Sequence, residues 1–171
     1  MQPQQKIIIR NLMPQDHRSI FKLLKNKQVM QYIGPGRALS DNEVIQWIND
    51  FYVKQSLGQA RRVVATEDSM LGICGVLQCK DVYDFGMYFL PEYWGQGYAF
   101  TACSIVLPQA IKQYGHHLTF FIAEGNTRCS NLAKKLDMQP YKSGIYHKQH
   151  GHYWKPAHIR EFDHVRKIIT I

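Results

Sequence analysis

The chain has 171 residues, of which 45% are hydrophobic and 20% are charged, and its formal net charge is +8. This composition is typical of one globular domain and excludes a disordered chain, and no apolar run approaches the roughly 20 residues that cross a bilayer. The positive charge favours an anionic partner, but the Lys and Arg residues are scattered, which argues against the concentrated stripe of a nucleic-acid binder.

The first part of the chain predicts one strand and two helices. Residues 6–12 form a short β-rich run. Residues 15–33 place apolar side chains at helical intervals and stop at the Gly-Pro-Gly of residues 34–36. Ser40 and Glu43 form a capping box, so a second helix is expected over residues 40–55.

The middle of the chain predicts an antiparallel meander, because its strand-like runs are joined by connections too short for parallel crossovers. A helix follows it and runs to Gly115, and Pro108 is expected to kink or shorten this helix. The C-terminal part predicts a strand, a short helix and a hairpin that turns at His150-Gly151. The ranges are 61–67, 70–79 and 82–90 for the meander, 118–123 for the later strand, 127–138 for the short helix and 141–162 for the hairpin.

This order predicts an α/β fold with a mixed, mostly antiparallel sheet of six or seven strands and about four helices on both faces. We expect a single domain over residues 1–171, as a monomer or a homodimer. Residues 1–12 lack the features of a secretory signal. The four cysteines, Cys74, Cys79, Cys103 and Cys129, show neither the spacing of a disulfide framework nor a CxxC pair. A cytoplasmic location without membrane contact is therefore expected.

The stretch LPEYWGQGYAF, residues 90–100, places two glycines where a strand meets a helix. It is not a Walker A loop, since Tyr98-Ala99 follow the second glycine instead of Lys-Ser/Thr. A dinucleotide fingerprint would need a small residue at Phe100 and a parallel unit at the start of the fold. Two interpretations of the glycine pair remain. It forms either a tight turn without a ligand or a binding site for a diphosphate, built from backbone N–H groups at the start of a helix.

Two motifs resemble the GNAT N-acyltransferases, and in particular the branch of ribosomal-protein N-terminal acetyltransferases. The first is FGMYFLPEYWGQGYAFTA, and the second is EGNTRCSNLAKKLDM, residues 124–138. The resemblance covers roughly residues 6–146. It implies the GNAT fold and acetyl-CoA as cosubstrate, with the diphosphate on the backbone around Gly95 and Gly97 and the pantetheine arm along the strand near Phe89 and Leu90. Further residues expected at the coenzyme are Trp94, Gln96, Tyr98, Ala99, Asn126 and Lys135.

The resemblance also implies a carboxylate that takes a proton from the acceptor amine. Alternation places Asp84, Gly86, Tyr88 and Leu90 on one face of their strand, opposite an apolar face. Asp84 stands where the branch usually has Glu and is the first candidate, and Glu124 is the second; an ordinary surface role stays open for both. Tyr88 and, in the last hairpin, His147 are expected beside the acceptor.

The chain departs from the family where many members carry a Tyr that acts as general acid. Ala133 stands there, and Cys129 replaces a Ser three residues after Asn126. A thiol can donate a proton, so Cys129 is a candidate acid, although a packing role is as compatible with its position. The histidines in HKQHGHY lack supporting carboxylates or cysteines, and no metal site is expected.

The sequence thus predicts an acetyl-CoA-dependent N-acetyltransferase. Its partners would be acetyl-CoA and an acceptor with a primary amine, either a protein N-terminus or a small molecule, attacked directly in a ternary complex. Two alternatives belong to other classes of protein: a non-catalytic acyl-CoA-binding module, and a basic nucleic-acid-binding domain.

Overall fold

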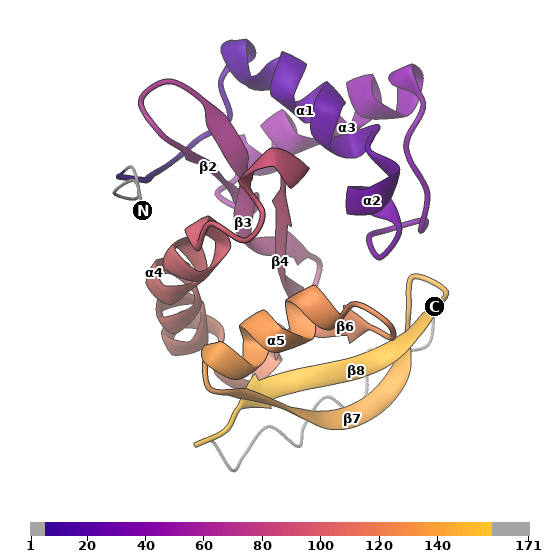
Figure 1. The fold of residues 1–171 in the computed structure, drawn as a ribbon, viewed down its shortest axis with the longest axis vertical. Helices are drawn as coiled ribbons and strands as arrows, with labels where there is room; N and C mark the ends of the chain where they lie inside the picture. The colour runs from indigo at the N-terminus through magenta and orange to yellow at the C-terminus, as the bar shows by residue number, and fades with distance from the viewer. Residues whose placement is uncertain (1–5, 159–171) are drawn as a thin grey trace.

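A computed structural model describes residues 6–158, so residues 1–5 and 159–171 of the expected domain lie outside the described part. Within it, the chain forms both helices and strands, as the α/β prediction requires (Figure 1). No helix in the described part is both long and apolar enough to cross a membrane. The strands are β1 (Ile8–Arg10), β2 (Arg62–Ala65), β3 (Met70–Cys79), β4 (Val82–Phe89), β5 (Leu118–Thr119), β6 (Phe121–Ala123), β7 (Met138–Tyr146) and β8 (Gln149–Pro156). The helices are α1 (His17–Leu24), α2 (Lys27–Met30), α3 (Asp41–Ser56), α4 (Tyr98–Tyr114) and α5 (Thr127–Lys135), with single 3-10 turns at Pro14–Asp16, Pro91–Tyr93 and Gly115–His117.

The strands form two sheets. Five of them pair in the order β1-β2-β3-β4-β5, antiparallel except for the short parallel contact between β4 and β5, and the other three pair in the order β6-β8-β7. The expected meander of β2, β3 and β4 is confirmed. The single sheet of six or seven strands is replaced by five strands and three, because the run 118–123 does not form one strand.

That run is divided at Phe120. Residues Leu118 and Thr119 pair with β4, whereas Phe121 onward pairs with β8, and the carbonyl of Phe120 already accepts from the N–H of Trp154 at 2.8 Å. The chain therefore leaves one sheet and joins the other within two residues. As a result β4 has no neighbour beyond Asp84 on this side, and a gap opens between β4 and β6.

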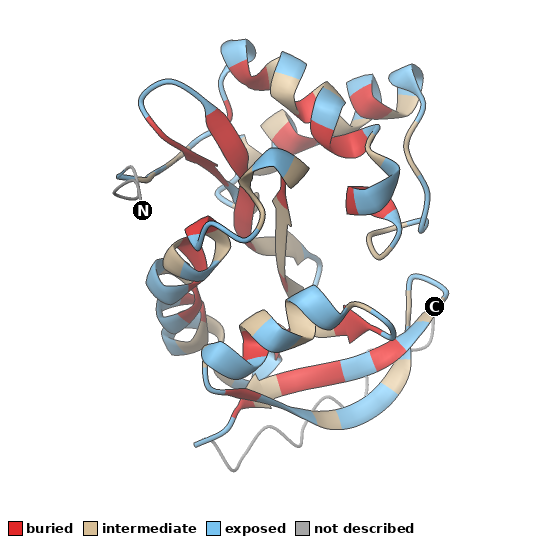
Figure 2. Ribbon diagram, in the orientation of Figure 1, coloured by how far each residue is buried: buried red, intermediate tan, exposed pale blue. Residues whose placement is uncertain are grey.

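The helices before β2 cover one face of the five-stranded sheet. Residues 15–33 do not form one helix, because α1 ends at the C-cap Lys25 and Asn26 starts α2 as its N-cap, its side chain accepting from the N–H groups of Gln28 and Val29. The predicted capping box of α3 is present between Ser40 and Glu43. Figure 2 shows buried stretches on α1, α2 and α3. The apolar side chains that pack there against the sheet include Ile20, Leu23, Leu24, Val29, Met30, Val44, Ile48 and Phe51.

The opposite face packs against α4 and α5, where a second cluster of buried residues joins the two sheets. Helix α4 continues without interruption through Pro108 to Tyr114, which corrects the expected shortening. Pro108 and Ser104 are both exposed, so the Ser104 carbonyl that loses its helical donor lies on the solvent side of the helix.

The last hairpin turns three residues earlier than predicted. Tyr146 pairs with Gln149, and the turn residues His147 and Lys148 both have positive φ, 48° and 64°. Such a two-residue turn matches the twist of the flanking strands. His150 therefore lies in β8, and the tip of the hairpin is formed by His147.

Candidate functional site

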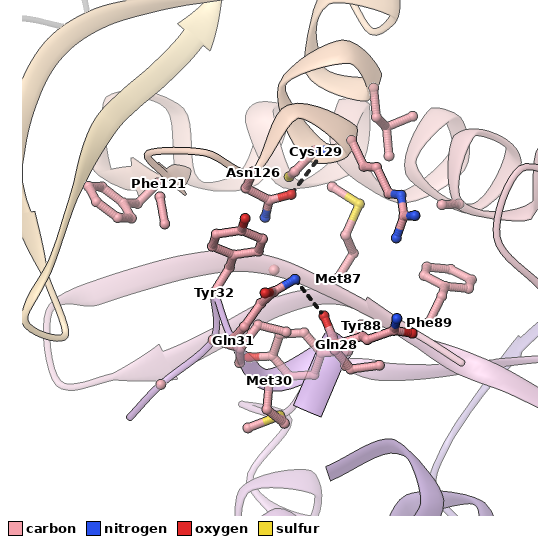
Figure 3. A pocket seen from close by; sticks show the side chains of 18 of the residues that line it. Gln28, Met30, Gln31, Tyr32, Met87, Tyr88, Phe89, Phe121, Asn126 and Cys129 are labelled. Carbon is pink, nitrogen blue, oxygen red and sulfur yellow. Dashed lines mark hydrogen bonds between the residues drawn. The ribbon is translucent and has the colours of Figure 1, made fainter. Parts of the chain in front are cut away.

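The gap between β4 and β6 opens into a cavity of about 1400 Å³. Its walls come from β4, the start of α4, α5, the segment around α2 and the tip of the β7–β8 hairpin. Figure 3 shows Tyr32, Met87 and Asn126 approaching this space from three of these elements. Ligand pockets commonly measure roughly 300–1,000 Å³, so the volume is large enough for two substrates at once.

The free edge of β4 supplies backbone groups to this cavity. The N–H of Leu90 donates to the carbonyl of Leu71 in β3 at 3.0 Å. Because hydrogen-bonded residues alternate along an antiparallel ladder, Met87 and Phe89 turn their peptide groups away from β3. The Phe89 carbonyl accepts from Nε1 of Trp94 at 2.8 Å. The N–H groups of Met87 and Phe89 therefore face the gap, whereas the N–H of Leu90 is bonded within the sheet.

The faces of β4 divide as alternation predicts. Phe85 and Phe89 lie in the core shared with α4 and α5, whereas Leu90 and Tyr88 belong to the packing against α1–α3. The register between β3 and β4 is unbroken at Gly86. The pairing of β4 with β3 therefore contains no β-bulge at Gly86.

The two glycines of LPEYWGQGYAF are required by the backbone, since Gly95 has φ 76° and Gly97 has φ 85°. Gly97 is the N-cap of α4 and no side chain caps this helix end. The first helical bond runs from the N–H of Thr101 to the carbonyl of Gly97. The N–H groups of residues 98–100 therefore have no acceptor within the helix, and this end of α4 attracts anions.

The side chains of this segment differ in their placement. Gly95, Gly97, Trp94 and Ala99 line the cavity. The aromatic ring of Tyr98 is buried in the core, and Gln96 is exposed, with its Nε2 donating to the carbonyl of Glu92. At the turn, residues 96 and 98 therefore offer only their backbone groups.

Helix α5 forms the wall opposite β4. Asn126 lines the cavity and caps α5, its Oδ1 accepting from the N–H of Cys129 at 3.2 Å (Figure 3). Lys135 lines the cavity from the last turn of α5. Near the start of the helix, the Arg128 guanidinium lies 4.4 Å from the centre of the Trp94 ring. Arg128 thus lies beside the segment that leads into the glycine turn, and Lys135 adds a second cation to the lining of the same cavity.

Cys129 lines the cavity, but its environment holds the thiol protonated. Burial raises the pKa of Cys129 to about 12, well above that of an ordinary thiol. A thiol that holds its proton so firmly is a poor donor to a thiolate. Ala133, where many relatives of the motif carry Tyr, is fully buried and belongs to the core.

Asp84, Tyr88 and His147 also line the cavity. Oδ2 of Asp84 accepts from Nη2 of Arg61 at 2.5 Å. Burial raises the pKa of the Asp84 carboxyl, and the Arg61 guanidinium opposes this rise. Burial likewise raises the pKa of Tyr88.

The structure does not bring Glu124 into this cavity. Glu124 is exposed and lines a separate hollow of about 420 Å³, together with His150 and His152 of β8. Its neighbours Ala123 and Gly125 line the main cavity, whereas Glu124 does not. Between residues 6 and 158, no group of three His, Cys, Asp or Glu side chains is arranged to hold a metal ion.

Several lining residues were missed in the sequence. Arg61 directly precedes β2. Tyr32 follows α2, and its hydroxyl donates to the Gly125 carbonyl at 3.1 Å. Tyr146 comes from the end of β7. No local motif marks these residues, because they reach the site only through the pairing of distant elements.

The comparisons with known proteins agree with this geometry. A family model described as acetyltransferase (GNAT) domain matches residues 6–139. Three solved structures share the fold. A GNAT-family acetyltransferase from Bacillus anthracis is 19% identical, with TM-score 0.69 over 89% of this chain and 94% of that one. A spermidine N-acetyltransferase from Vibrio cholerae, in complex with CoA and spermine, is 17% identical, with TM-score 0.67 over 86% and 93% of the two chains.

The third is RimL, a ribosomal L7/L12 alpha-N-protein acetyltransferase in complex with CoA. It is 13% identical, with TM-score 0.66 over 90% of this chain and 95% of that one. At these identities the structures show a common fold and no more. No curated protein sequence matches the chain.

Proposed function

Because this chain belongs to the GNAT family of acetyltransferases, whose cosubstrate is acetyl-CoA, we propose that it transfers the acetyl group to a primary amine by direct attack in a ternary complex inside the cavity. The observation that carries the proposal is the continuity of this cavity. It connects the uncapped start of α4 to the free edge of β4 and to the Asp84 carboxylate.

The start of α4 fits the diphosphate of the coenzyme. A Cβ at Gly95 would meet no heavy atom within 4 Å, so the space beside the turn is open. Free N–H groups at a helix start bind phosphate oxygens, and Arg128 and Lys135 add positive charge nearby. We propose that Trp94, the backbone of residues 95–99 and Asn126 complete this part of the site.

The free edge of β4 suits the pantetheine arm, which would pair with it as an additional strand. The N–H groups of Met87 and Phe89 are the available donors there. One of them would donate to the reacting carbonyl oxygen as that oxygen becomes negatively charged. A donor already in place can lower the barrier by roughly 3 kcal/mol.

When bound, acetyl-CoA supplies the thioester carbon that bonds to the amine nitrogen while the sulfur leaves with the electrons of the broken bond. We propose that Asp84 accepts the proton lost by the amine, directly or through water. The leaving sulfur takes its proton from water, since a thiol has a reference pKa of about 8.5 and needs no dedicated acid. Cys129 then has a packing role.

The charges of the cavity favour an acceptor with a single ammonium group. Among the described lining residues Asp84 is the sole carboxylate, and Arg61 already pairs with it. A polyamine would bring further positive charges toward Arg61, Arg128 and Lys135. We therefore propose a protein N-terminal amine, as in the ribosomal-protein branch, or a small monoamine, with Tyr88 and His147 beside it.

The test is release of CoA thiol from acetyl-CoA with a panel of amines: peptides with free and blocked N-termini, an amino sugar and spermidine. We expect turnover with free monoamines, none with the blocked peptide, and spermidine among the poorest acceptors. A thermal-shift comparison of acetyl-CoA with NAD accompanies it, and stabilisation by NAD alone would overturn the assignment of the cavity.

Two further outcomes separate the alternative functions. Binding of acetyl-CoA without turnover across the panel would identify a non-catalytic module. Nucleic-acid retention that falls steeply with salt in a filter-binding series, without coenzyme binding, would identify a basic nucleic-acid-binding domain.

A further inference from the structure

A buried arginine is fixed beside the candidate base. Arg61 directly precedes β2, and only 5% of it is exposed. Its Nη2 donates to Oδ2 of Asp84 at 2.5 Å and to the main-chain carbonyl of the same residue at 3.2 Å. Its Cζ lies 5.2 Å from the centre of the Tyr88 ring. The guanidinium of Arg61 is therefore held against β4, although Arg61 belongs to the chain just before β2, two strands away.

The sheet is shaped to admit this side chain. Gly75 of β3 and Gly86 of β4 are cross-strand partners. A Cβ at Gly86 would lie 2.7 Å from Nη2 and 2.9 Å from Nε of Arg61, and a Cβ at Gly75 would lie 3.7 Å from the Arg61 Cα. Two adjacent positions without side chains thus leave a shallow trough across the sheet. The glycine at position 86 is explained by this close approach.

The pair leaves one oxygen of the carboxylate available. Oδ2 of Asp84 is bonded to Arg61, and no described residue donates a hydrogen bond to Oδ1. The Asp84 side chain is 19% exposed, against 6% for Arg61. Both side chains line the cavity, and the carboxylate is the more exposed of the two.

We propose that Arg61 is a positioning residue, which holds the Asp84 carboxylate charged and turns Oδ1 toward the acceptor amine. This inference rests on the proposed function, in which Asp84 takes the amine proton. The titratable groups that interact with the carboxylate are Arg61 before β2, Tyr88 on β4, Tyr146 and His147 at the end of the β7–β8 hairpin, and Tyr153 on β8. Arg61 is the permanent cation among them, so its loss would leave a buried acid without a partner.

The first test needs no turnover. Asp84 is titrated by the ¹³Cγ shift in the coenzyme-free protein, with the signal assigned from Asp84→Asn. Replacing Arg61 by Met should raise the pKa of Asp84 by about 1–3 pH units, since an opposite charge at contact distance has an effect of this size. Arg62→Met is the matched control: Arg62 is exposed and bonds Asn11, so the titration should not move.

The second test is the pH dependence of kcat/KM. In Arg61→Met the acidic limb of the profile should move to higher pH by the same amount as the pKa of Asp84 in the first test. Arg61→Lys should return the limb most of the way to its wild-type position. Gly86→Ala keeps Arg61 but displaces its guanidinium, so it should also move the acidic limb to higher pH. If Arg61→Met does not fold, Arg61→Lys and Gly86→Ala carry the test. Acetyl-CoA affinity should be equal in all of them.

Unchanged titration and an unchanged pH profile in folded Arg61 variants would overturn the inference and leave Arg61 a structural residue. Failure of the proposed function looks different: the wild-type protein would acetylate no amine, whatever the titration of Asp84 shows.

Discussion

The thiol of Cys129 stands in the cavity wall where a proton donor would be useful, but burial keeps its proton in place. Its N–H is also committed to the cap of α5. The thiol of Cys129 can therefore occupy this position of the motif without acting as a proton donor. The packing interpretation left open by the sequence is the one that the environment favours.

Cys129→Ala tests this interpretation. A general acid contributes roughly 10²–10⁴-fold to the rate, so its loss would be obvious. We expect kcat to fall by less than about tenfold, because only packing is lost. A fall of about 100-fold or more in kcat, with acetyl-CoA affinity retained, would make Cys129 the acid.

Asp84→Asn should have the opposite result. An amide of the same shape cannot take the amine proton, so kcat/KM should fall by roughly 10²–10⁴-fold while the dissociation constant of acetyl-CoA stays unchanged. Asp81→Asn is the control, since Asp81 is exposed in the turn between β3 and β4. Equal activity of the two variants would remove Asp84 from the mechanism.

Because burial raises the pKa of Asp84, the acidic limb of kcat/KM should lie above the usual carboxyl range near pH 4. Activity requires the charged form, so it is lost as the pH falls through this raised pKa. The profile is measured with a peptide whose amine titrates at higher pH. A limb at or below pH 4 would contradict the assignment.

Among the elements that position the site, the turn before α4 requires glycines with positive φ. Gly97→Ala places a Cβ at φ 85°, which costs about 1–2 kcal/mol of folding free energy and disturbs the N–H groups of residues 98–100. Gly58→Ala, at φ 70° after α3, is the matched control. Urea unfolding should show similar losses in both variants, but calorimetry should show weaker acetyl-CoA binding only for Gly97→Ala. Equal affinities would contradict the proposed diphosphate site.

The link between β1 and α1 depends on a buried ion pair. Asp16 is 3% exposed and accepts from Arg10 at 2.7 and 2.9 Å and from the N–H of Met13 at 2.9 Å. Burial alone would raise the pKa of Asp16, but these donors prevail and hold it below its usual value.

A lowered pKa means that the charged form stabilises the fold, so this contribution is present above about pH 4 and is lost as the pH falls through the lowered value. Asp16→Asn should reduce the free energy of unfolding at pH 7 by about 2 kcal/mol. The difference from wild type should shrink in acid. Asp41→Asn, which breaks an exposed pair with Lys25, should stay within about 0.5 kcal/mol. A constant difference at all pH values would show that charge is not the cause.

At the scale of the whole molecule, the opening of the cavity depends on a feature that local patterns do not encode. Residues 118–123 are a continuous apolar run and predict one strand. Whether Phe120 continues along β4 or turns to β8 is decided by tertiary pairing, in which Trp154 supplies the donor. The order of the elements, the alternation along β4 and the glycine turn were predictable from local residue properties.

The acceptor side was less predictable for the same reason. Tyr32, Arg61 and Tyr146 meet Asp84 or the neighbouring cavity wall from three separate parts of the chain. Proline at position 108 and asparagine at position 26 show a similar limit, since solvent exposure lets α4 continue and a side-chain cap lets a new helix begin. Both outcomes require knowledge of what surrounds the residue.

The central claim is that the peptide groups between Gly95 and Ala99 bind the diphosphate of acetyl-CoA. A crystal structure of the wild-type protein with CoA tests it most directly. We expect phosphate oxygens within hydrogen-bonding distance of these N–H groups and the pantetheine arm along Met87 and Phe89. Coenzyme bound elsewhere, with the turn making contacts only to other parts of the protein, would contradict it.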